Sequence, residues 1–219
     1  MSEEFIDILK DVKAIKVKEL LAETLGAFKV KDAVLDYTFI DTIKMAGHVC
    51  PTVASAYVCC QEALKVLYPD GIPVRGEIEV LIYGEPDEGS YGVIGQVFSF
   101  LTGAAPETGF KGLGHKFKRK NLLKYSSEKI DPEALAFKFT RIDNRKSVTA
   151  KLFPGRFPYD QEAEQSVGKL LEKIIWEAAS DEEKENFKSL WIKKIINIVV
   201  DKKDINSWLI LEEGGTKNE

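Results

Sequence analysis

The sequence has few cysteines and histidines and no long apolar run, and these shortages exclude several classes of protein. Its 3 Cys and 2 His among 219 residues are too few for a disulfide framework, and unpaired thiols suit a reducing compartment. No run of 18 apolar residues is present, which argues against a membrane-spanning helix. The charged, amphipathic start lacks the basic and apolar regions of a signal peptide. We therefore expect a cytoplasmic protein without a membrane partner.

The charge of the chain is also close to balanced. There are 31 Lys and Arg against 35 Asp and Glu, and the net charge is -4. This balance gives no general attraction to nucleic acid, and we expect no nucleic-acid partner. The apolar content of 44% argues against a disordered chain.

Apolar periodicity predicts an α+β fold: an antiparallel sheet with packed helices and an appended C-terminal helical hairpin. Helical spacing covers residues 3–26, in two pieces, and about 51–68. Strand patterns occupy residues 77–83, 134–141 and 147–153, with a further short strand at 205–211. We therefore place an α+β core at residues 1–155 and the helical hairpin with a terminal tail at 156–219.

The strongest functional signal is the segment Gly47-His48-Val49-Cys50-Pro51, directly before an apolar helix. Pro51 suits the first helical position, which makes Cys50 the N-cap. Free N–H groups and the helix dipole favour a thiolate there. A thiolate binds metal or attacks an electrophile, and His48 can ligate the same ion or accept the thiol proton. The alternative is a loop histidine beside a structural cysteine.

This segment resembles the formylmethanofuran dehydrogenase E-subunit-like family, whose signature opens with Gly-His-x-Cys-Pro-Gly. Weaker matches follow in the family's order: a strand at 77–83, Gln96 before Thr102-Gly103, and Lys120-Asn121-Leu122. The resemblance covers roughly residues 38–153 and implies a metal-binding site around His48 and Cys50. It does not imply formylmethanofuran chemistry.

The chain also departs from the pattern of that family. Thr52 replaces the glycine after Cys-Pro, and Ala56 and Val58 replace Gly and Arg on either side of a tyrosine. Ala104 stands where the family often has a second cysteine, directly after Thr-Gly. The usual ligand set of the family is therefore incomplete in this sequence.

His115 is the other histidine, in a loop at residues 103–125. With zinc or another divalent transition metal, His48, Cys50 and His115 would supply three protein ligands, and water would fill the fourth position of an open site. The alternative is a solvated loop histidine. The same loop has six basic and no acidic residues between Lys111 and Lys124, which suits a small anionic substrate or simply a solvated surface.

Three hypotheses follow from these patterns. The first is a zinc-type metal-binding protein, with a metal-dependent enzyme acting on a small anionic substrate as one form of it. The second is a metal-free thiol or redox protein that uses Cys50, and the third is a non-catalytic accessory subunit. Wide apolar stripes at residues 160–200, with Trp176 and Trp191, lead us to expect a homodimer through the hairpin. The alternative is a hairpin folded onto its own sheet.

Overall fold

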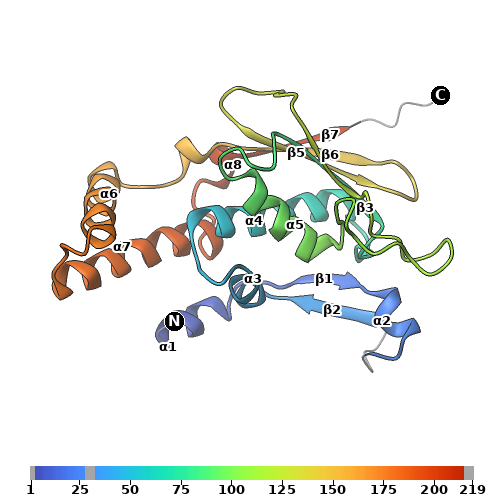
Figure 1. Ribbon diagram of the computed structural model, residues 1–219, viewed down its shortest axis with the longest axis horizontal. Coiled ribbons are helices and arrows are strands. Elements are labelled where there is room, and N and C mark those ends of the chain that lie inside the picture. The colour runs from blue at the N-terminus through green and yellow to red at the C-terminus, as the bar shows by residue number, and fades with distance from the viewer. Residues whose placement is uncertain (1–2, 28–32, 215–219) are drawn as a thin grey trace.

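A five-stranded mixed sheet forms one layer of the computed structural model, which describes residues 3–27 and 33–214 (Figure 1). Its strands lie in the order β4-β3-β5-β6-β7. Their bounds are β3 (Ile78–Tyr83), β4 (Leu123–Ser126), β5 (Leu135–Arg141), β6 (Ser147–Leu152) and β7 (Leu209–Gly214). The prediction of an antiparallel sheet is wrong at one pair, because β3 and β4 run parallel. A helix and a long loop connect these two strands, as a parallel crossover requires.

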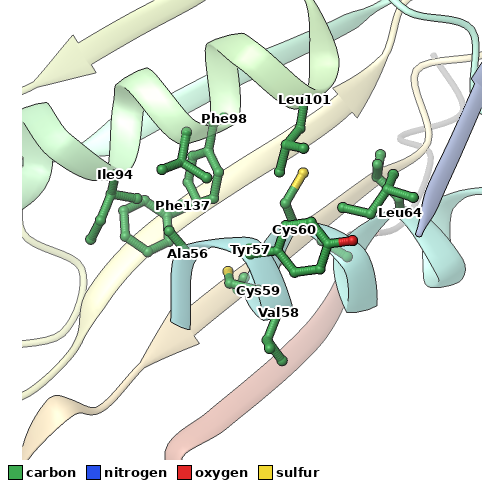
Figure 2. Packing of buried hydrophobic residues seen from close by; sticks show 14 of the residues in the cluster. Ala56, Tyr57, Val58, Cys59, Cys60, Leu64, Ile94, Phe98, Leu101 and Phe137 are labelled. Carbon is green, nitrogen blue, oxygen red and sulfur yellow. The ribbon is translucent and has the colours of Figure 1, made fainter. Parts of the chain in front are cut away.

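Two helices, α4 (Pro51–Leu67) and α5 (Tyr91–Thr102), cover one face of this sheet (Figure 1). The alternation of β3 explains the contact, because Ile78, Val80 and Ile82 are buried on the helix side. Figure 2 shows Phe98 of α5 and Phe137 of β5 packed together, with ring centroids 5.0 Å apart. Within the described ranges no helix is both long and apolar enough to cross a membrane.

A third layer lies on the other side of α4 and α5 (Figure 1). It consists of α1 (Glu3–Leu9), β1 (Ile15–Lys18), α2 (Leu20–Thr24), β2 (Val34–Tyr37) and α3 (Phe39–Ala46). The helix predicted over residues 3–26 in two pieces, divided around 14–17, is α1 and α2, but the segment between them is the strand β1, which pairs antiparallel with β2. Ile15 and Val17 alternate with exposed or half-buried lysines and point into the core, and both are β-branched, which favours a strand.

The C-terminal helices leave the sheet and return to it. After β6 and the short helix η2 (Pro154–Arg156) come α6 (Gln161–Ile175), α7 (Asp181–Val199) and α8 (Ile205–Trp208). Strand β7 then pairs antiparallel with β6. The predicted strand at 205–211 thus begins as a helix, and the boundary at residue 155 does not divide the sheet: the helical hairpin is an insertion between two paired strands. Residues 215–219 of the predicted tail lie outside the described residues.

Candidate functional site

The site predicted from the sequence lies at the junction of α3 and α4. Gly47 ends α3 in a left-handed conformation with φ 74°, which glycine adopts without strain. The chain is extended at Cys50, with φ -148° and ψ 167°, and Pro51 opens α4. The Cys50 sulfur accepts a hydrogen bond from the backbone N–H of Val53 at 3.4 Å. The predicted N-cap position of Cys50 is confirmed.

His48 is exposed beside this helix start. Its Nδ1 lies 3.0 Å from the backbone oxygen of Ala46. When Nδ1 carries the proton and donates to that oxygen, Nε2 is the nitrogen free to ligate a metal or accept a proton. Cys50 itself is half-buried. The segment therefore presents one accessible imidazole and one partly covered thiol.

Helix α7 holds the segment from one side. The indole N–H of Trp191 donates to the backbone oxygen of Val49 at 2.8 Å. This bond joins residues 142 positions apart in the chain, so the hairpin is fixed next to the candidate site. Residues of the hairpin therefore belong to the surroundings of Cys50.

Two of those surrounding residues escaped the sequence analysis. The Tyr159 hydroxyl is buried and, among the described residues, has no hydrogen-bond partner. Burial raises the pKa of Tyr159, and the negative charges of Glu164 and of a Cys50 thiolate raise it further. Lys194 is only 6% exposed, and its ammonium lies 4.4 Å from the centre of the Tyr159 ring. The available signal was a lysine within the apolar stripe of α7.

His115 lies elsewhere, in a tight turn. Leu113 and Lys116 exchange backbone hydrogen bonds of 2.9 and 3.1 Å around it, and its side chain is exposed. In Figure 1 the loop between α5 and β4 is at the opposite end of the molecule from the start of α4, which lies beside α7. Within residues 3–27 and 33–214, no three His, Cys, Asp or Glu side chains gather into a metal site. His48, Cys50 and His115 of one chain therefore do not form the predicted three-ligand set.

The position of the missing second cysteine is equally distant from Cys50. Helices α4 and α5 run side by side in the same direction, and Figure 2 shows Leu101 next to Cys60. Cys60 is ten residues after Cys50 on one helix, which is about 15 Å along its axis. Ala104 is the third residue after Leu101 and lies just beyond Gly103, the C-cap of α5. Even a cysteine at position 104 would therefore lie too far away to share an ion with Cys50 of the same chain.

Comparison with known proteins adds no family to this geometry. No protein-family model matches the chain. No curated protein sequence matches it either. The resemblance to the formylmethanofuran dehydrogenase E-subunit-like family therefore stays a prediction carried by the motif at residues 47–51 and the weaker matches after it.

The other two thiols have a structural role. Cys59 and Cys60 are both 0% exposed inside α4. Burial raises the pKa of each thiol far above its usual range, because a thiolate would lose its hydration there. Among the three cysteines, Cys50 alone is not fully buried. Thiol chemistry on the folded protein is therefore directed to Cys50.

The basic loop at residues 103–125 is partly a structural device. Arg119 is 7% exposed and donates to Glu19 at 2.6 Å, while Arg75 donates to the other oxygen of Glu19 at 2.9 Å. Gly76 and Gly103, both with positive φ, make room for the Arg119 guanidinium, since a Cβ at Gly76 would lie 1.7 Å from its Nη1. Arg119, one of the six basic residues of this loop, is therefore part of the buried core and does not add to the charge of the surface.

The acidic loop after β3 lies at the surface. Glu85 and Asp87 are exposed. Glu88 forms an ion pair with Lys129 on the surface, and that hydrogen bond lowers the pKa of Glu88. None of the three carboxylates joins a metal-binding group among the described residues. They give no support to a general base at this loop.

Proposed function

We propose that the protein binds a divalent transition metal, zinc in the first instance, through the Cys50 thiolate and the His48 imidazole. The observation that carries the proposal is the position of Cys50 at the N-terminus of the 17-residue helix α4, where its sulfur accepts the Val53 N–H. A metal ion binds cysteine as the thiolate, and its binding releases the thiol proton. A thiolate with an imidazole is a donor set that suits zinc.

One chain supplies only part of the coordination sphere. Zinc in proteins takes four ligands, of which at least three come from side chains in well-attested sites. The described residues of one chain bring no three such side chains together, so the three-ligand site does not fit within a monomer. We therefore derive no reaction from it.

A second copy of the chain is the simplest source of the missing ligand. Three apolar side chains on the hairpin are exposed to solvent: Leu171 by 36%, Ile175 by 66% and Trp176 by 76%. Exposed apolar patches of this kind mark interaction surfaces. In an antiparallel two-fold dimer, the hairpin end of each subunit packs on the loop end of its partner, and the same contact occurs twice. We propose that the partner subunit's His115 completes the site at His48 and Cys50, giving two equivalent sites for each dimer.

Metal analysis tests the first part of the proposal. We expect about one zinc ion for each chain in purified protein, and at least a tenfold loss in Cys50→Ser and in His48→Ala. Cys59→Ala is the matched control, because it removes a thiol from the same helix without touching the site. Wild-type protein without metal, or unchanged metal in Cys50→Ser, would contradict the proposal.

Mixed dimers test whether the site is shared. Cys50→Ser and His115→Ala chains carrying different affinity tags are co-expressed, and the heterodimer is isolated through both tags. If each site takes ligands from both chains, the heterodimer keeps one of its two sites intact. We then expect half of the wild-type metal in the heterodimer and none in either mutant homodimer. A heterodimer without metal would show that all ligands come from one chain. Full metal in the His115→Ala homodimer would exclude His115 as a ligand.

A metal-free thiol protein is the second candidate, and the incomplete ligand set in one chain favours it. In this case the Cys50 thiolate attacks an electrophile directly, and His48 accepts the thiol proton. The probe is iodoacetamide, from which the thiolate displaces iodide. We expect fast labelling of Cys50 below pH 8 that slows in His48→Ala. Labelling that rises only through about pH 8.5, the ordinary range for a thiol, contradicts this candidate. No metal, no reactive thiol and a stable heteromer would instead support an accessory subunit.

A further inference from the structure

A cavity of about 430 Å³ lies at the root of the hairpin, between the segment entering α6 and the C-terminal half of α7. Its volume falls within the range of small-molecule sites. Polar side chains dominate its wall, namely Tyr159, Asp160, Lys193, Lys194, Asn197 and Lys203. Asn197 ties the two sides together by donating to the backbone oxygen of Pro158 at 3.2 Å. The cavity is thus held open by two elements that are fixed to each other.

Lys194 is the buried cation of this cavity. Its side chain is 8% exposed and forms an ion pair with Glu164 of α6. Its ammonium also lies over the aromatic rings of Tyr159 and Trp191, at 4.4 and 5.8 Å from their centres. A lysine taken out of water needs a compensating negative charge. Glu164 supplies that charge here. Its carboxylate shows that Lys194 binds an acid group at this position.

Glu164 is not locked into the cavity. Its side chain is 50% exposed, so it can return to water when another acid group takes its place. A ligand acid group that takes the place of Glu164 brings its own negative charge, so the buried Lys194 ammonium stays paired after the exchange. Exchange of Glu164 for a ligand carboxylate or phosphate is therefore energetically inexpensive.

The remaining charged side chains of the wall are two lysines and two aspartates. Neither Lys193 nor Lys203 has an ion-pair partner among the described residues. The carboxylate of Asp160 is already engaged, since it accepts the backbone N–H groups of Glu162 and Ala163 at 2.9 and 3.1 Å. Asp204 is the other acidic residue of the wall. Lys193 and Lys203 therefore balance the charges of Asp160 and Asp204, and the preference for an anion comes from Lys194 once Glu164 has left it.

We propose that this cavity binds a small organic anion, a carboxylate or phosphate compound, whose acid group replaces Glu164 on Lys194. Lys193 and Lys203 hold the ligand from the rim. The Lys194 ammonium lies 5.8 Å from the centre of the Trp191 ring, and Trp191 donates to the backbone oxygen of Val49, the residue before Cys50. The ligand would thus lie next to the Cys50 centre, and its use as a substrate there rests on the proposed function.

Calorimetric titration with inorganic phosphate and with succinate, at constant ionic strength, tests the proposal. We expect saturable binding that weakens at least fivefold in Lys193→Gln and in Lys203→Gln. Lys169→Gln is the matched control, because it removes the same charge from an exposed position of α6 outside the cavity. Glu164→Gln removes the competing carboxylate and should tighten binding at least threefold. Lys194→Gln should abolish binding. If that variant fails to fold, the tighter binding expected of Glu164→Gln still tests the proposal.

The outcomes separate this proposal from the metal site. The titrations use metal-free protein and Cys50→Ser, so binding or its absence does not depend on zinc. No saturation by 10 mM of either probe overturns the anion site. Equal weakening by Lys169→Gln also overturns it, because only the overall charge would then matter. Weaker binding in Glu164→Gln would overturn the exchange with Glu164.

Discussion

The core around α4 and the α6–α7 hairpin handle apolar surface in opposite ways. In α4 even the small residues are covered, and Ala56, Tyr57 and Cys60 are all 0% exposed. On the hairpin, Ile175 and Trp176 are 66% and 76% exposed. The apolar side chains of the core are covered by other parts of the same chain, whereas the hairpin has apolar side chains that the chain leaves exposed. This difference is the reason why we propose association through the hairpin and expect the core to carry most of the stability.

The charged groups repeat this contrast. In the core, Glu19 is 6% exposed and binds two arginines from distant loops. On the hairpin, the pair of Lys188 with Glu185 has both side chains more than half exposed. Buried pairs are costly to break, while exposed pairs contribute little. Substitutions in the two regions should therefore differ sharply in their effect.

The largest effect is expected from the aromatic core. Phe137 is 0% exposed and contacts Phe98 and Tyr91 edge-on. Phe137→Ala should lower the free energy of unfolding by about 4 kcal/mol, from lost burial and a cavity. Urea unfolding at a protein concentration low enough to keep the chain monomeric measures it, with Trp176→Ala as the hairpin counterpart expected within about 0.5 kcal/mol of wild type. Similar losses in the two variants would remove the distinction between the regions.

The buried ion pairs come next. Glu19→Gln leaves the guanidiniums of Arg75 and Arg119 without their shared carboxylate, which should cost about 3 kcal/mol. Glu133→Gln is the exposed comparison, since Glu133 pairs with Arg156 on the surface and should cost less than about 1 kcal/mol. Both are measured by urea unfolding at one pH. A loss in Glu19→Gln as small as in Glu133→Gln would mean that water reaches this cluster.

A pH dependence of stability is expected from the buried thiols. Burial raises the pKa of Cys59 and Cys60 in the folded state, so their contribution is full below the unfolded thiol pKa and is lost as pH rises above it. The unfolded chain releases these protons first, and unfolding should become about 2 kcal/mol easier between pH 8.5 and 9.5.

The control for this prediction is the double variant Cys59→Ala/Cys60→Ala. It should be less stable near pH 7, because buried atoms are lost, but its stability should stay nearly flat over the same pH interval. Urea unfolding of both proteins at five pH values measures the slopes. Parallel slopes would show that other groups cause the loss.

The smallest effect on stability is expected on the hairpin, together with the clearest effect on assembly. Trp176→Lys should change the free energy of unfolding of the monomer by less than about 0.5 kcal/mol. It should weaken dimerisation at least tenfold in sedimentation measurements. Leu25→Lys is the matched control, because Leu25 is 64% exposed away from the hairpin. A wild-type monomer at micromolar concentration would contradict the predicted dimer.

Features set by neighbouring residues were predictable from the sequence. Pro51 directly after Cys50 fixed the helix start, and the burial of Cys59 and Cys60 followed from their place in an apolar helix. Strand β1 was missed because Ile15 and Val17 alone are too short a pattern to separate a strand from a helix. Only pairing with β2 decides it.

The parts of the site that were missed depend on distant contacts. Lys194 and Tyr159 reach the neighbourhood of Cys50 because the hairpin folds back and Trp191 binds Val49. Nothing near residue 50 in the sequence signals this. The separation of His115 from Cys50 also follows from packing, since α4 and α5 run in the same direction and carry the two loops to opposite ends (Figure 1). Sequence order alone gives neither result.

The return of the chain to β7 has a consequence for synthesis and for protein engineering. Because β7 pairs with β6 after the whole hairpin has been made, the sheet reaches its final width only when residues 209–214 have left the ribosome. Until then the edge of β6 is open, a state that favours aggregation. A hairpin deletion should therefore join residue 154 to residue 208 through a short linker and keep β7, since truncation after Phe153 would remove an edge strand as well as the hairpin.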